Sequence, residues 1–95
     1  MDKKEVVKKL ISILEKNQKD IGEEVVEIEE KTKPVGDLIK FDSLMGVALT
    51  VTCCEIFQIG DVHKIESLFV DENDKGHPYA LNVGQIADRI LTLTK

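Results

Sequence analysis

The sequence predicts an all-α fold with three main helices and one short helix. Apolar residues recur at helical spacing near both ends of the chain, and a central segment is apolar almost throughout. Residues that favour helix N-caps stand before each of these three segments. The chain has 95 residues, 42% hydrophobic and only 4% aromatic, so we expect one domain, residues 1–95, with a core of Leu, Ile and Val.

The first helix is predicted over residues 3–18. Its apolar side chains fall at i, i+3, i+4 and i+7 spacings and form one wide stripe; they are Val6, Val7, Leu10, Ile11, Ile13 and Leu14. Asp2 followed three residues later by Glu5 is a capping-box pattern. Both signals place the start of the helix near residue 3.

The second helix is predicted to begin at Asp42-Ser43 and to end near Gln58. Aspartate and serine both favour the N-cap position, so the pattern leaves open which of them caps the helix. The preceding segment, residues 19–41, is predicted to be a long ordered loop, because Pro34 and other turn-forming residues interrupt it.

The remaining elements are a short helix and a final helix. The short helix is predicted around residues 62–68, and a polar loop around residues 71–79. Asn82 and Gln85 form a second capping-box pattern. Ile86 and the apolar residues after it supply a stripe, so the last helix is expected to follow directly.

Charge and cysteine usage exclude several classes of protein. The net charge of −5 argues against a sequence-independent grip on nucleic acid, which needs a basic face. The longest uncharged run, residues 43–54, is shorter than the roughly 20 residues of a membrane span, so we expect no stable membrane insertion. Cys53 and Cys54 are adjacent and no secretory signal is recognisable, which favours reduced thiols and a cytoplasmic protein. No metal-ligand spacing is present.

The most informative motif is Asp42-Ser43-Leu44. A serine stands at the start of a helix, behind a long loop, and no histidine lies near it in sequence to act as a base. A hydrolase nucleophile is therefore not the natural interpretation. A phosphate ester on this serine would instead meet the free amides of the first helical turn, at the positive end of the helix dipole.

This motif resembles the modification site of the acyl carrier proteins. The resemblance covers nearly the whole chain, since helix lengths, loop order and acidic charge also agree. The further matching segments are Val35-Gly36-Asp37-Leu38 before the motif, Phe57 at the end of the second helix, Leu68-Phe69, and residues 83–90 in the last helix. The tripeptide alone is common, so its position in a small acidic helical chain carries the resemblance.

The resemblance implies a four-helix bundle that carries acyl groups and catalyses nothing itself. It implies that Ser43 bears a covalent 4′-phosphopantetheine, with Asp42 and Leu44 completing the motif. The partners would be a phosphopantetheinyl transferase and enzymes that transfer or modify acyl groups in fatty acid, lipid or secondary-metabolite synthesis. The carrier would be a monomer. Two alternatives remain: a peptidyl or aminoacyl carrier, and a small helical interaction module that uses the second helix.

The second helix departs from the family because it has almost no acidic residues. Leu49, Cys53 and Phe57 are expected to face the core. The residues predicted to contact partners are Leu44, Met45, Val47, Ala48, Val51 and Glu55. These residues either form an exposed apolar docking face or are simply buried under the long loop. The family picture also suggests a chain-binding cavity lined by Leu49, Ile65, Leu68, Ala87 and Ile90.

Two further residues of the second helix allow more than one interpretation. Gly46 lies inside the predicted helix, where glycine costs about 1 kcal/mol relative to alanine. It either lets a partner or the cofactor arm approach the backbone, or it permits close helix packing. Cys54 is expected to be a partly exposed thiol, whereas Cys53 is expected to belong to the core.

Overall fold

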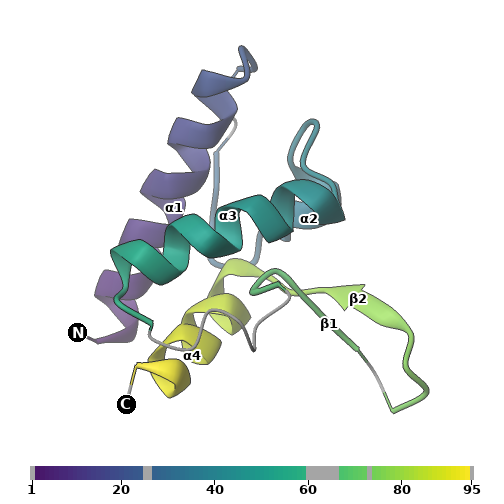
Figure 1. Cartoon of the computed structure of the whole chain (residues 1–95). Coiled ribbons are helices and arrows are strands. Elements are labelled where there is room, and N and C mark those ends of the chain that lie inside the picture. The colour runs from purple at the N-terminus through teal and green to yellow at the C-terminus, as the bar shows by residue number, and fades with distance from the viewer. Residues whose placement is uncertain (1, 25–26, 60–66, 73, 95) are drawn as a thin grey trace.

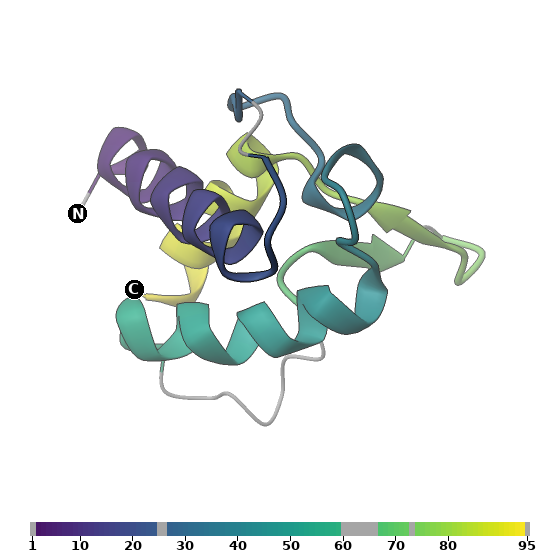
Figure 2. The same cartoon turned by 90° about the horizontal axis from the view of Figure 1, so that it is seen from above.

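The computed structural model describes residues 2–24, 27–59, 67–72 and 74–94, and at Ser43 it describes the backbone alone. This part of the chain is mostly helical and contains a small two-stranded sheet (Figure 1). Figure 2 shows α3 running along one side of the molecule, while the two strands project at the end away from the chain termini.

Helix α1 spans Lys3–Asp20 and confirms the first predicted helix, with two more residues at its end. The Asp2 side chain accepts a hydrogen bond from the Glu5 amide at 2.9 Å, as the capping pattern predicted. Helix α1 packs against α4. The buried residues of α1 recur every four positions and form its inward face; they are Val6, Leu10, Leu14 and Gln18.

The predicted loop contains a short helix that the sequence did not indicate. Helix α2 spans only Pro34–Asp37, with proline at its first position, and it is an irregular turn because Val35 and Gly36 have non-helical backbone angles. The Lys33 amide donates to Asp37 Oδ2 at 2.8 Å and so closes this turn. Leu38 and Phe41, just after the turn, are buried. The loop is therefore anchored to the core immediately before α3 begins.

Helix α3 spans Ser43–Ile56, which confirms the second predicted helix apart from its last two residues. Phe57 is the C-cap, and Gln58 adopts a positive φ of 57°. The Ile59 amide then donates to the Cys54 carbonyl at 2.8 Å. This left-handed turn ends the helix and buries Ile59 in the core.

The described part of the chain is mostly helical, as predicted, but two short strands add a small β-hairpin that an all-α fold does not include. Strand β1 (Val70–Glu72) pairs antiparallel with β2 (Pro78–Ala80), and Asp71 lies opposite Tyr79. The sequence suggested a loop because both strands are short and β1 is acidic. The pairing continues one position beyond the strands, where the Leu81 amide donates to the Phe69 carbonyl at 2.9 Å.

The predicted short helix around residues 62–68 is not seen where the structure can test it. Ser67 and Leu68 are not helical, and residues 62–66 lie outside the described residues. Leu68 and Phe69 are fully buried, so this segment contributes side chains to the core in an irregular conformation.

Helix α4 spans Val83–Leu93 and confirms the last predicted helix. Its capping box is complete: the Asn82 side chain accepts from the Gln85 amide at 2.8 Å, and the Gln85 side chain accepts from the Asn82 amide at 2.9 Å. The Gly84 amide, also in the first turn, donates to the Glu30 carbonyl at 2.8 Å. The loop after α1 therefore helps to cap α4.

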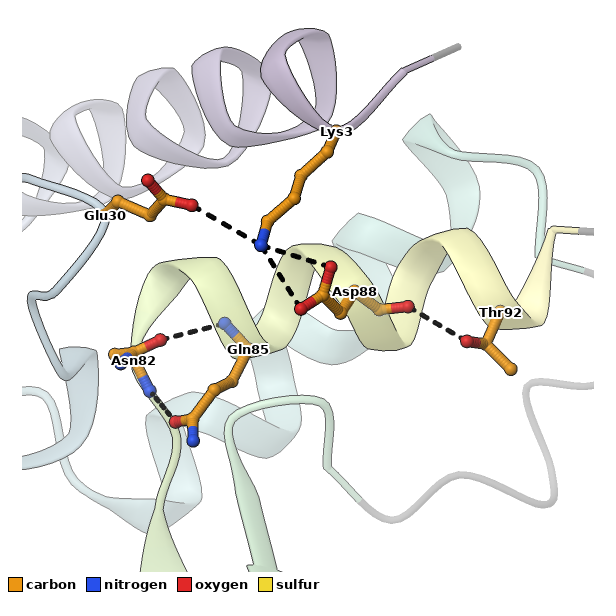
Figure 3. A network of polar contacts seen from close by, with 6 residues as sticks. All are labelled: Lys3, Glu30, Asn82, Gln85, Asp88 and Thr92. Carbon is orange, nitrogen blue, oxygen red and sulfur yellow. Dashed lines mark hydrogen bonds and ion pairs between the residues drawn. The ribbon is translucent and has the colours of Figure 1, made fainter.

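Charged side chains join α1, this loop and α4 on the surface. Lys3 Nζ lies 3.5 Å from Glu30 Oε1 and 3.2 Å from Asp88 Oδ1, and Figure 3 shows the ammonium between the two carboxylates. All three side chains are largely exposed to solvent. Such ion pairs add little stability, so packing of the apolar faces holds α1 to α4.

Candidate functional site

Asp42 is the residue that caps α3. Its backbone is extended, and its Oδ1 accepts a hydrogen bond from the Met45 amide at 2.9 Å. Ser43 is therefore the first residue inside the helix and is not the cap. In this position a residue lies among the first-turn amides, which lack carbonyl partners within the helix.

The chain before Ser43 is held in place from both sides. The buried Phe41 ring meets the Phe69 ring edge-to-face, with centroids 5.4 Å apart. Lys40 adopts a positive φ of 58°, which turns the chain sharply, and its ammonium lies 2.8 Å from Glu23 Oε1. These contacts fix the direction in which α3 starts, and with it the place of the Ser43 backbone.

The outward face of α3 is an apolar stripe made by Leu44, Val47, Ala48 and Val51. Leu44 is 76% exposed, and Val47 and Val51 are 45% and 47% exposed. The spacing i, i+3, i+4 and i+7 places these residues on one side of the helix. Since these side chains are exposed, the alternative that they are simply buried does not hold for them. Glu55 is exposed one turn beyond Val51.

Met45 does not belong to this outward stripe. Its side chain is half-buried, it packs against the core, and its sulfur accepts a hydrogen bond from Asn17 Nδ2 of α1 at 3.4 Å. On a helical wheel Met45 lies about 100° from both Leu44 and Gly46, on the side that turns toward α1. Met45 therefore lies beside the exposed stripe, and its predicted contact with partners stays a prediction.

The inward face of α3 contains the expected core residues and one polar residue that sequence reasoning missed. Leu49, Cys53 and Phe57 are buried, as predicted. Thr50 is also buried; its hydroxyl donates to the Gly46 carbonyl at 2.7 Å and accepts from the Leu68 amide at 2.8 Å. Thr50 thus fixes α3 to the segment before the hairpin.

Gly46 also lies on this inward face. A Cβ atom placed on it would lie 3.4 Å from Ser67 Oγ and 3.5 Å from Phe69 Cβ. The glycine is buried under these side chains, so it does not offer its backbone to an approaching partner. The structure therefore argues against the first interpretation of Gly46, and the ordinary contact distances show that close packing does not require glycine here either.

Both cysteines lie in the core, so the expectation that Cys54 is partly exposed is wrong. Cys53 and Cys54 are 0% and 1% exposed. Burial, with a smaller effect of the neighbouring Cys54, raises the pKa of the Cys53 thiol to about 12, and burial also raises the pKa of Cys54. Both thiols are therefore protonated near neutral pH and are poor nucleophiles.

The residues predicted to line a chain-binding cavity belong to the core, and two of them reach surface hollows. Leu49, Leu68, Ala87 and Ile90 are all buried in one cluster, while Ile65 lies outside the described residues. Leu49 and Thr52 line a hollow of about 270 Å³ between α3 and α1. Ile90 lines a separate hollow of about 260 Å³ with Val6 and Phe57. Leu68 and Ala87 line neither.

Comparisons of the chain with family models, curated proteins and solved structures find no match. None of the helices in the described part of the chain is both long and apolar enough to cross a bilayer. Among the same residues, no group of three or more His, Cys, Asp or Glu side chains is placed to hold a metal ion.

Proposed function

We propose that this protein is an acyl carrier protein whose 4′-phosphopantetheine is attached to Ser43. The observation that carries the proposal is the capping of α3 by Asp42, because a serine that only capped the helix would explain the motif equally well. Since the cap is Asp42, Ser43 is the first residue inside the helix.

The surroundings of Ser43 suit a phosphodiester. The first-turn amides and the helix dipole stabilise a negative charge at this end of α3. The anchored Phe41 ring and the turn at Lys40 hold the site in one place, so that an enzyme meets a preformed surface. When bound, the group supplies a thiol that holds an acyl chain as a thioester.

In this proposal the fold is an acyl-carrier-type helical bundle with an inserted hairpin. Helices α1, α3 and α4 correspond to the three main helices, and β1 and β2 occupy the connection before the last of them. The carrier works as a monomer in the cytoplasm and catalyses no reaction itself. A carrier for peptidyl or aminoacyl groups would use the same attachment.

Intact-mass analysis tests the attachment directly. The chain is coexpressed with a phosphopantetheinyl transferase, and wild type is compared with Ser43→Ala and with Ser12→Ala, an exposed serine of α1. We expect wild type and Ser12→Ala to gain the mass of one phosphopantetheine and Ser43→Ala to gain none. Absence of the addition from wild type would refute the carrier function.

The exposed stripe of α3 favours a second candidate, a small helical interaction module with no cofactor. That candidate predicts an unmodified protein that binds its partner through Leu44 and Val47. Binding that survives Ser43→Ala, in a protein that is never loaded, would favour the module. Loading of a panel of acyl and aminoacyl groups would then separate the two kinds of carrier.

A further inference from the structure

We propose that the phosphopantetheinyl transferase that acts on Ser43 docks on the outward stripe of α3 by apolar contact, without the help of charge pairs. This inference rests on the proposed carrier function and names the partner chemistry of the same site. The stripe consists of Leu44, Val47, Ala48 and Val51. An occupant of this stripe must therefore present an uncharged, apolar surface.

The stripe is continuous with the site that the transferase must reach. The stripe begins at Leu44, directly after Ser43. Its last member, Val51, lies eight residues after Ser43, which is about 12 Å along the helix axis. On the helical wheel Val47 lies about 40° from Ser43, within the same quarter of the helix surface. An enzyme that covers Ser43 therefore also covers the first half of the stripe.

The charge around the stripe decides the kind of contact. Residues 43–54 carry no ionisable acid or base apart from two buried thiols, and Glu55 is the first charged side chain after Asp42. A basic docking surface would find almost nothing on α3 to pair with. Three large apolar side chains, by contrast, are 45% to 76% exposed and would lose contact with water on docking.

The extent of the stripe favours a transient enzyme over a second copy of this chain. A stable interface buries about 800 Å² on each partner, from roughly 20 to 30 residues. Four side chains on one helix fall far short of that number. They suit the brief contact of an enzyme that must release the chain after each reaction.

The kinetics of loading test the inference. The KM for the full-length apo chain is measured with coenzyme A and a broad-specificity phosphopantetheinyl transferase, at low and high NaCl. Apolar docking predicts that KM changes less than about twofold between 0.05 and 0.5 M NaCl, because salt screens charge pairs and leaves apolar contacts intact. Docking through charge pairs would raise KM severalfold over this range.

Substitutions of opposite charge sharpen the test. Val47→Asp and Val47→Lys are both expected to raise KM about tenfold, with kcat within about twofold of wild type, because either charge must be desolvated. Ser12→Asp on α1 is the matched control and should leave KM unchanged. Far-ultraviolet circular dichroism and the melting temperature check that each variant is folded.

Each outcome has a distinct meaning. Two results would overturn apolar docking but leave the carrier function standing. One is a wild-type protein that is loaded with a strongly salt-dependent KM. The other is a KM that rises in only one of the variants Val47→Asp and Val47→Lys. No loading of wild type removes both proposals. A wild-type dimer that Val47→Asp converts to a monomer would assign the stripe to a second copy of the chain.

Discussion

Helices α3 and α4 begin in the same way but differ on their outer faces. Each has an extended N-cap residue whose side chain accepts from an amide three positions later, Asp42 in α3 and Asn82 in α4. On α4 the exposed residues are mainly polar or charged, and Asp88 pairs with Lys3. On α3 they are apolar apart from Glu55, with Leu44 76% exposed.

The comparison of α3 with α4 shows which face of each helix the fold requires to be apolar. The inward faces of both helices are apolar and buried, which is sufficient to hold them in the fold. An apolar outward face adds nothing to that core and lowers solubility. Helix α4 shows that a helix of this fold can have a polar outward face. The exposed stripe of α3 therefore needs a reason outside folding, and contact with a partner is such a reason.

The largest effect is expected at two threonines that make similar bonds in the two helices. Thr50 in α3 and Thr92 in α4 each donate to the carbonyl four residues earlier, but only the buried Thr50 also accepts from the Leu68 amide. Thr50→Val should lower the free energy of unfolding by about 2 kcal/mol, because a buried amide loses its acceptor. Thr92→Val should change it by less than about 0.5 kcal/mol. Urea unfolding measures both, and equal effects would contradict the assigned role of Thr50.

Helices α1 and α4 and their caps could be predicted from sequence, because the signals are local. The Asn82 and Gln85 pattern and the four-residue spacing in α1 need no knowledge of the rest of the chain. Thr50 could not be found in this way, since its partner amide is eighteen residues away. The hairpin was missed for a different reason: each of its strands has only three residues, too few to show a periodic pattern.

The candidate site was predictable in part. The motif made Ser43 the candidate attachment residue, but the choice between Asp42 and Ser43 as the cap needed coordinates. Helical spacing correctly separated Leu49, Cys53 and Phe57 from the outward stripe. It did not predict that Met45 turns toward Asn17, because that contact depends on how α3 lies against α1.

Alanine at two helical glycines should have opposite effects. A Cβ atom at Gly46 in α3 would make ordinary contacts, the nearest at 3.4 Å, so Gly46→Ala should stabilise the protein by up to about 1 kcal/mol. A Cβ atom at Gly84 in α4 would approach Glu30 Cγ to 2.8 Å, so Gly84→Ala should destabilise it by roughly 1 kcal/mol. Thermal unfolding of both variants tests this, and destabilisation by Gly46→Ala would mean that Phe69 cannot yield.

The caps provide a finer test of the task of Ser43. Asp42→Ala and Asn82→Ala should each cost about 1 kcal/mol, since each leaves a first-turn amide without its acceptor. Ser43→Ala should change stability by less than about 0.5 kcal/mol while it abolishes loading. Chemical denaturation gives the first quantity and intact mass the second. A large loss of stability in Ser43→Ala would show that the serine side chain has a structural role.

The smallest effect is expected at the charged edge that joins α1 to α4. The hydrogen bond with Asp88, together with the charges of Asp88 and Glu30, raises the pKa of Lys3 above its usual 10.5 despite some desolvation. The stabilisation is therefore fully present below pH 10.5 and is lost as the pH rises through the higher pKa of the folded state. The lysine is exposed, so the difference in melting temperature between wild type and Lys3→Gln should be small at pH 7 and should vanish in 0.5 M NaCl. A difference that persists in high salt would show that Lys3 acts through the packing of its stem. This edge should thus respond to salt, whereas docking on the uncharged face of α3 should not.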